Sequence, residues 1–247
     1  MTQVYRTLRV APGDKGVLGV VIDAPPMNLI GPELVRDLVG LLGVLESGQE
    51  TRVVVLESAH PDYFVPHVDL TKVAEYTAEA AKAGGPDDAS LGMLWHKLSE
   101  LPVVSIAKIR GRARGAGSEL ALACDMRFAA RENAILGQIE VGVGTTPGAG
   151  GVQHLARLLG RGRVMEAILG ADDFDAEQAV TCGRSAGACP RRQSPGTSRS
   201  VVALCDQVGS TPWDYAHARR PNGSTIGSTK ALRRTMFSQV GRQGLEP

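Results

Sequence analysis

The sequence is poor in the features that mark membrane, disulfide-rich or metal-binding proteins. Aromatic residues make up only 4% of the chain, so a core must be built from Val, Leu, Ile and Ala. The four cysteines follow neither a disulfide framework nor a zinc pattern. No apolar run approaches the ~20 residues of a membrane span, and the first residues lack the order of a signal peptide. We therefore expect a cytoplasmic protein that does not associate with a membrane.

The charge is unevenly distributed although the net charge is only +1. Residues 1–182 hold 17 Lys/Arg and 23 Asp/Glu, whereas residues 183–247 hold 10 and 3. The second segment is also rich in Ser, Gly and Pro, and ordered periodicity fades there. This change favours an out-of-frame reading of a GC-rich gene, or a sequencing error. A natural divergent tail is the alternative, and a nucleic-acid-binding tail ranks third.

Strand-like and helix-like patterns alternate over the first 180 residues. Apolar β-branched runs predict strands, and apolar residues at helical spacing predict helices. This alternation predicts an α/β protein with a largely parallel sheet. The predicted strands are 17–22, 52–57, 103–107, 126–129 and 134–137, and the predicted helices are 33–45, 70–83, 91–98, 119–123, 152–159, 162–169 and one that begins near 175. The Pro-rich stretch 60–69 fits neither element.

Two carboxylates occupy unusual sequence surroundings. Glu119 follows Gly115-Ala116-Gly117-Ser118, where a turn gives way to a helix that could offer N–H groups to an anion. Taken alone, this motif favours an ordinary tight turn with a first-turn acid. Glu140 lies among apolar residues and glycines, so it is either an acid with a raised pKa or a rim residue.

Several other kinds of site are disfavoured. The glycines at 148, 150 and 151 follow Pro147 and match neither a P-loop nor the G-x-G-x-x-G motif. The five histidines have no metal-ligand spacing, and no G-x-S-x-G motif indicates a serine hydrolase. The sequence therefore predicts no metal and no nucleotide cofactor.

Taken in order, these segments resemble the enoyl-CoA hydratase/isomerase (crotonase) superfamily from about Val17 to Ala179. The motifs that carry the resemblance are Pro26-Met27-Asn28-Leu29, Phe64-Val65-Pro66-His67-Val68-Asp69-Leu70, Gly115-Ala116-Gly117-Ser118-Glu119-Leu120-Ala121, Cys124-Asp125, Gly137-Gln138-Ile139-Glu140 and Gly144-Thr145-Thr146-Pro147-Gly148-Ala149-Gly150-Gly151. The resemblance implies a spiral of ββα units with a helical C-terminal region. It also implies assembly as a homotrimer or hexamer.

The resemblance also implies a role for each site residue. The backbone N–H groups of Val68 and Ala116 match the pair that holds a thioester oxygen, an oxyanion hole. Pro66 and Leu70 match positions that line the CoA groove. Glu119 and Glu140 match the two glutamates that handle water and protons in the hydratases, and the Gly148 N–H matches a position that helps to hold the water.

The expected function is the hydration of 2-trans-enoyl-CoA to 3-hydroxyacyl-CoA. Acyl-CoA is then the substrate, coenzyme A is part of it, and no further cofactor or nucleic acid is required. The alternatives are an enoyl-CoA isomerase, which typically manages with the second glutamate, and a catalytically impaired acyl-CoA-binding protein.

Two departures from the family pattern affect these expectations. Val65 and Pro66 replace the small residues that usually precede the first oxyanion amide, and Pro66 lacks an N–H. Beyond about residue 180 the resemblance stops. We therefore predict a crotonase-like core at 1–180 and a divergent tail at 181–247 that is frameshifted or poorly packed.

Overall fold

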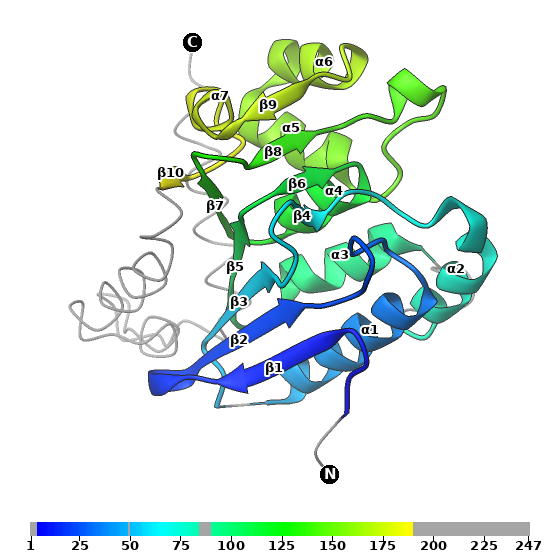
Figure 1. Cartoon of the computed structure of the whole chain (residues 1–247), viewed down its shortest axis with the longest axis vertical. Helices are drawn as coiled ribbons and strands as arrows, with labels where there is room; N and C mark the ends of the chain where they lie inside the picture. The colour runs from blue at the N-terminus through cyan, green and yellow to red at the C-terminus, as the bar shows by residue number, and fades with distance from the viewer. Residues whose placement is uncertain (1–3, 49, 84–89, 190–247) are drawn as a thin grey trace, which may run out of the picture.

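Two sheets organise the computed structural model, which describes residues 4–48, 50–83 and 90–189 (Figure 1). The larger sheet has six strands in the order β1-β2-β3-β5-β7-β10. Only β1 runs antiparallel to its neighbour, and the other strands pair in parallel. The strands are β1 (Leu8–Pro12), β2 (Val17–Ile22), β3 (Val53–Ser58), β5 (Val104–Ile109), β7 (Met126–Ala130) and β10 (Gly187–Cys189). The α/β fold with a largely parallel sheet is confirmed.

The smaller sheet has four short strands in the order β4-β6-β8-β9. These strands are β4 (Tyr63–Val65), β6 (Arg112–Arg114), β8 (Ile135–Gly137) and β9 (Asp173–Asp175). β9 is antiparallel to β8, and the other pairs are parallel. Figure 1 shows these strands stacked in chain order above β3. The loops that leave their carboxyl ends carry most of the candidate site.

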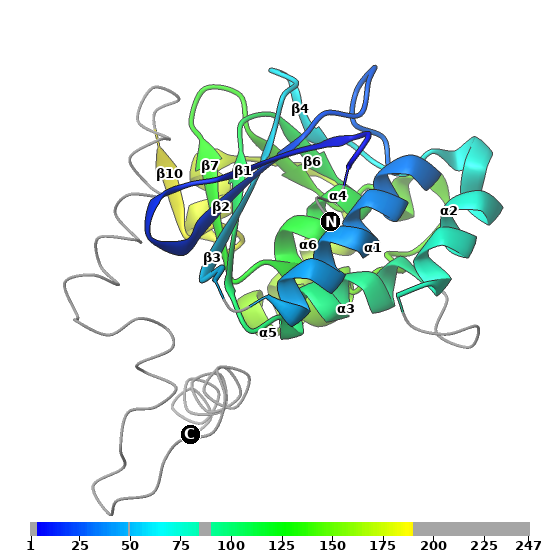
Figure 2. The same ribbon diagram turned by 90° about the horizontal axis from the view of Figure 1, so that it is seen from below.

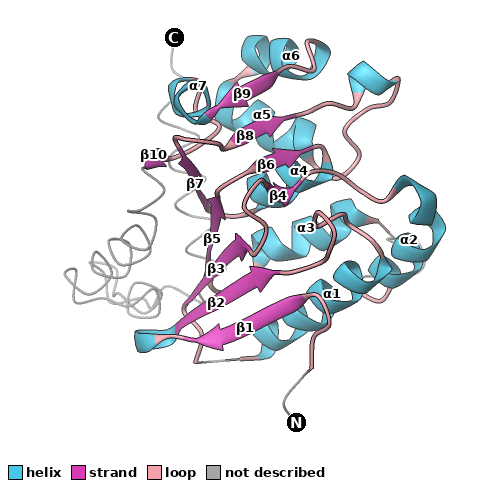
Figure 3. Cartoon of the chain, in the orientation of Figure 1, coloured by secondary structure: helices cyan, strands magenta, loops and turns pink. Residues whose placement is uncertain are grey.

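Helices gather on one side of the larger sheet, as Figures 2 and 3 show. They are α1 (Pro32–Ser47), α2 (Val73–Ala81), α3 (Leu91–Glu100), α4 (Ala116–Ala123), α5 (Gly151–Leu159) and α6 (Arg161–Leu169). The last helix, α7 (Ala176–Thr181), packs instead against β8, β9 and β10. Short 3-10 turns lie at η1 (Asp14–Gly16), η2 (Leu70–Lys72) and η4 (Val141–Val143). In α1, Pro32 occupies the first turn, and leucines 34, 38, 41, 42 and 45 form a buried face at helical spacing.

Helix α4 lies at the centre of the molecule. All eight of its residues are buried, and it packs against α3, α5 and β6. A helix that is covered on every side can carry a carboxylate only where that group is hydrogen-bonded or shifted in pKa. Glu119 is such a group, since α4 carries it in its first turn.

The described part of the predicted tail packs on the larger sheet. After α7, Arg184 and Ser185 are buried, and β10 extends the sheet by pairing with β7. The Ser185 hydroxyl donates to the carbonyl of Arg127 at 3.0 Å. The rest of the tail, residues 190–247, lies outside the described residues. The boundary at 180 and the predicted character of the tail stay predictions.

Candidate active site

A glycine with a positive φ begins the turn that leads into α4. Gly115 has φ 51° and ψ −128°, a conformation that residues with a Cβ rarely adopt, and its N–H donates to the Gly137 carbonyl at 3.0 Å. This geometry fixes the plane of the peptide that ends in the Ala116 N–H. Ala116 is the first residue of α4, so its N–H has no partner within the helix. The turn therefore presents one N–H at a fixed place.

Gly117 brings α4 into direct backbone contact with β4. A Cβ on Gly117 would lie 1.9 Å from the Val65 carbonyl oxygen, so no other residue fits. Taken alone, the sequence of this motif favoured a tight turn. At Gly117 the close neighbour is the chain's own backbone.

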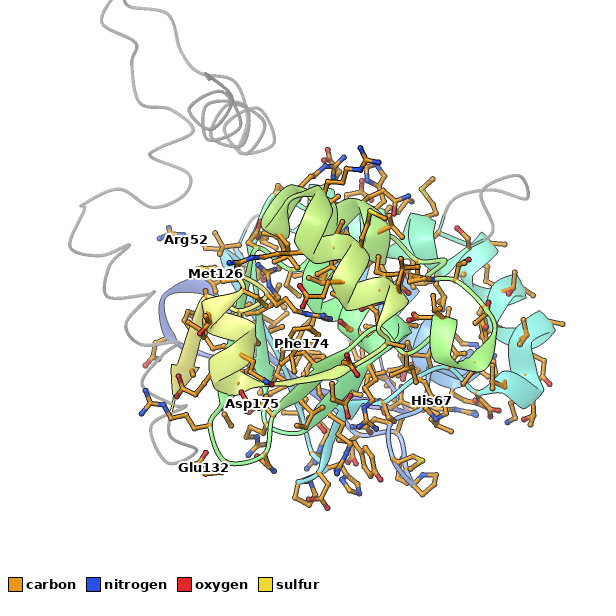
Figure 4. The ribbon with its side chains drawn as sticks, turned by 90° about the horizontal axis from the view of Figure 1, so that it is seen from above. Arg52, His67, Met126, Glu132, Phe174 and Asp175 are labelled. Carbon is orange, nitrogen blue, oxygen red and sulfur yellow. The ribbon has the colours of Figure 1, made fainter. Side chains whose placement is uncertain are left out.

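Ile30 holds the segment that carries Val68. The Ile30 N–H donates to the His67 carbonyl at 3.1 Å, and the Asp69 N–H donates to the Ile30 carbonyl at 2.9 Å. This is a parallel bridge between Ile30 and Val68, in which the N–H of Val68 itself faces away from Ile30. Because the Val65 carbonyl meets α4, the chain at 64–69 runs between residues 28–30 and α4. Figure 4 labels His67 in this segment.

Glu119 is buried, with 2% of its surface exposed. Its Oε1 accepts hydrogen bonds from the N–H groups of Ala149 and Gly151, both at 2.8 Å. Burial raises the pKa of Glu119 to about 7, although the two N–H groups oppose the rise and the nearby Glu140 adds to it. A carboxyl group with this pKa can both accept and release a proton at neutral pH.

Glu140 is half-buried at the start of η4. The Gln138 amide nitrogen lies 3.3 and 3.4 Å from its two carboxylate oxygens. Burial raises the pKa of Glu140, whereas the Arg184 guanidinium lowers it. A Cβ on Gly115 would lie 3.4 Å from the Glu140 Oε1, so this carboxylate lies against the turn that presents the Ala116 N–H.

Gln138 is a side chain of the site to which the sequence gave no role. It is fully buried, and a Cβ on Gly151 would meet both its Nε2, at 2.8 Å, and the Glu119 Oε1, at 2.9 Å. The amide therefore lies between the two glutamates. The signal that could have found it is its polar side chain directly after a strand, two residues before Glu140.

For the remaining candidate residues, the structure gives the exposure and the position in the chain. Gly148 is exposed and precedes Ala149, whose N–H binds Glu119. Pro66 is buried, and Leu70 is 74% exposed at the first position of η2. The roles of all these residues, and the convergence of the Val68 and Ala116 N–H groups, stay predictions.

The described residues limit two other kinds of site. They bring together no group of three or more His, Cys, Asp or Glu side chains that could hold a metal ion. None of their helices has the length and apolar character needed to span a bilayer.

Comparison with known proteins places this geometry in context. Residues 13–214 match the family model described as enoyl-CoA hydratase/isomerase. The chain is 36% identical over 166 residues to the short-chain-enoyl-CoA hydratase of Clostridium acetobutylicum, covering 66% of this chain and 62% of the relative. It is 33% identical over 181 residues to the protein of Arabidopsis thaliana named probable enoyl-CoA hydratase 2, mitochondrial, covering 71% and 57%. The chain thus spans about three-fifths of the length of these curated relatives.

Solved structures show the same fold. A structure from Streptomyces avermitilis, provisionally assigned as an enoyl-CoA hydratase, is 49% identical with a TM-score of 0.80, covering 100% of this chain and 94% of that chain. The human mitochondrial delta3-delta2-enoyl-CoA isomerase is 24% identical with a TM-score of 0.75, covering 97% and 88%. The second similarity concerns the fold alone.

Proposed function

Because the chain belongs to the enoyl-CoA hydratase/isomerase family, we propose that it adds water across the 2,3 double bond of 2-trans-enoyl-CoA to give 3-hydroxyacyl-CoA. The observation that carries the proposal is the buried carboxyl of Glu119, bound by the Ala149 and Gly151 N–H groups beside Glu140. Both glutamates that the hydration requires are present, and the Gln138 amide lies between them.

The thioester oxygen would bind between the N–H groups of Val68 and Ala116. Attack of water on the β-carbon of a conjugated thioester moves negative charge onto this oxygen. Fixed backbone donors stabilise such charge without reorganising, and removing one donor typically costs about 3 to 4 kcal/mol. Support comes from Gly115, whose conformation fixes the Ala116 N–H, and from Ile30, which leaves the Val68 N–H on the side away from itself.

The two glutamates would divide the proton transfers. Ionised Glu119 takes a proton from the water as its oxygen bonds to the β-carbon. Protonated Glu140 gives a proton to the α-carbon, so the carbon–carbon π bond is replaced by one C–O and one C–H bond. Solvent then resets both carboxyl groups. The reaction is redox-neutral and needs no redox cofactor, and the two glutamates and backbone donors are proposed to suffice without a metal.

The test is hydration of crotonyl-CoA, followed by loss of the ultraviolet absorbance of the conjugated thioester. We expect turnover by the purified chain and a loss of at least about 100-fold in kcat for Glu119→Gln. The exposed Glu177→Gln, in α7, is the matched control and should retain the wild-type rate. Binding of crotonyl-CoA by folded protein without turnover would refute the proposal and favour an acyl-CoA-binding protein.

The same variants separate hydration from isomerisation. An isomerase that uses chiefly Glu140 would keep much of its rate in Glu119→Gln and lose it in Glu140→Gln. The presence of both glutamates favours the hydratase. We also propose a homotrimer or hexamer, as the family resemblance implies, and light scattering after gel filtration measures its mass.

A further inference from the structure

Asn28 ties its own loop to the segment that leads to Val68. It is 2% exposed and adopts φ 62°, a left-handed conformation that Asn tolerates better than most residues. Its own loop is closed by two hydrogen bonds with Ala24: the Ala24 N–H donates to Oδ1 at 2.8 Å, and the Asn28 N–H donates to the Ala24 carbonyl at 2.8 Å.

The Asn28 amide nitrogen then ties this loop to the chain that leads to Val68. Nδ2 donates to the Ser58 hydroxyl at 2.8 Å and to the Phe64 carbonyl at 3.1 Å. Ser58 Oγ in turn donates to the Tyr63 carbonyl at 2.5 Å and accepts from the His60 N–H at 3.0 Å. The side chain of Asn28 therefore fixes the beginning of β4 from outside the smaller sheet.

Two residues after Asn28, Ile30 makes the bridge that fixes the other end of the segment. Its backbone binds the His67 carbonyl and the Asp69 N–H, the two groups on either side of Val68. The Val68 N–H thus lies in a span held at Phe64 by Asn28 and at residues 67 and 69 by Ile30. Both anchors belong to one short stretch of chain, so a displacement of that stretch moves both.

We propose that Asn28 is a positioning residue for the Val68 N–H, and this inference rests on the proposed function. In this role Asn28 contacts no reacting atom. It holds the backbone of residues 64–69 against α4, where the missing side chain of Gly117 allows close approach. Because catalysis by backbone donors depends on placement to within a fraction of an ångström, loosening the Asn28 contacts lowers kcat more than it changes KM.

The test compares Asn28→Asp with Asp37→Asn. Asp at position 28 keeps the Oδ1 acceptor and the left-handed conformation but loses the Nδ2 donor. Asp37 is a second buried anchor, 7% exposed, whose Oδ2 accepts from the N–H groups of Arg6 and Thr7 at 2.7 and 2.6 Å. It holds the N-terminal segment to α1 and has no part in the Asn28 contacts, so it controls for the loss of a buried hydrogen-bond network.

Two readouts are measured: kcat and KM for crotonyl-CoA hydration, and amide hydrogen exchange at Asp69. We expect Asn28→Asp to lower kcat by about 10- to 100-fold, with KM within about threefold, and to speed Asp69 exchange at least about tenfold. Asp37→Asn should change neither. Ser58→Ala, which removes the acceptor for Nδ2, should produce a smaller loss in the same direction and serves if Asn28→Asp does not fold.

The outcomes separate the inference from the proposed function. Folded Asn28 and Ser58 variants with wild-type exchange at Asp69 and wild-type kcat would overturn the inference while leaving the hydratase proposal standing. An equal kcat loss in Asp37→Asn would also overturn it. A wild-type chain without hydratase activity, in which Asn28→Asp still speeds Asp69 exchange, would reject the proposed function and retain the positioning role.

Discussion

The Glu119 carboxylate accepts a 2.8 Å hydrogen bond from the N–H of Gly151, the first residue of α5. Helix α4 thus supplies the carboxylate, and the start of α5 supplies an N–H group that donates to it. The N-terminal end of a helix favours a negative charge, which partly offsets the burial of this carboxyl group. The balance leaves the pKa of Glu119 at about 7 and leads to the first two predictions.

The rate of hydration should depend on the ionisation of Glu119. A general base acts only when it is deprotonated, so kcat/KM should fall about tenfold per pH unit below a midpoint near 7. Steady-state assays with crotonyl-CoA from pH 5 to 8 check this. A flat profile across that range would remove Glu119 from the role of base.

The same pKa makes Glu119 destabilising at alkaline pH. Its pKa rises from 4.5 to about 7 on folding, so the folded state holds its proton more tightly than the unfolded state. The stabilising contribution of this proton is complete below about pH 4.5 and is lost as the pH rises through 7. The shift corresponds to a loss of roughly 3 kcal/mol.

Glu119→Gln removes this dependence and can still accept both hydrogen bonds. Urea unfolding should find the variant more stable than wild type by about 2 to 3 kcal/mol at pH 8 and close to wild type at pH 5. Greater destabilisation at pH 8 than at pH 5 would have the opposite sign and contradict the assignment.

A methyl group at residue 151 should displace the Glu119 carboxylate and the Gln138 amide. The Cβ of Gly151→Ala would lie 2.8 Å from Gln138 Nε2 and 2.9 Å from Glu119 Oε1, so both groups must move. We expect kcat to fall by about 10- to 100-fold. Gly162→Ala in α6 is the matched control, because its Cβ meets nothing within 4 Å, and it should leave kcat unchanged and stabilise the helix slightly. Equal kinetics in the two variants would disprove the crowding.

Arg184 carries a buried charge that interacts with the carboxyl groups of Glu140 and Asp173. Its side chain is fully buried over the Phe174 ring, 4.7 Å from the ring centroid, and its three guanidinium nitrogens have no hydrogen-bond partner within the described residues (Figure 4 labels Phe174). Burial lowers the pKa of Arg184 to about 10. Arg184→Leu should therefore raise the free energy of unfolding by about 1 to 4 kcal/mol. Thermal unfolding checks this against the exposed Arg161→Leu, which should change little.

Most long elements of the fold could be predicted from the sequence because their own residues determine them. The run at 17–22 matches β2, and the leucines of 33–45 lie within α1. Asp175 begins α7 with a capping box, a signal carried entirely by local residues. Such elements need little information from distant parts of the chain.

The short strands could not be predicted in this way. The stretch 60–69 was expected to contain no regular element, yet it holds β4, and no strand was predicted between 107 and 126, where β6 lies. These three-residue strands have no period to detect and exist because each pairs with a neighbour distant in sequence. β1 was also missed, since its pattern is mostly exposed.

In the candidate site too, the sequence indicated individual residues but not their distant contacts. The sequence identified Glu119 and Glu140, but the contacts that place them come from Ala149, Gly151 and Gln138. The hydrogen bonds to Glu119 join residues 30 and 32 positions apart, a distance over which no local pattern can indicate a partner. The part played by Asn28 is likewise visible only through its contacts with Ser58 and Phe64.

At Gly117 the main chain of α4 rests directly on the main chain at Val65. The spacing between the two proposed amide donors is then determined by atoms that every residue type shares. Random replacement should therefore be tolerated at position 68, whose side chain is only partly buried, whereas position 117 should accept glycine alone and the buried positions 65 and 116 only side chains that fit the core. In the proposed hydratase, the side chains around the acyl group can then change while the backbone donors to the thioester oxygen keep their places.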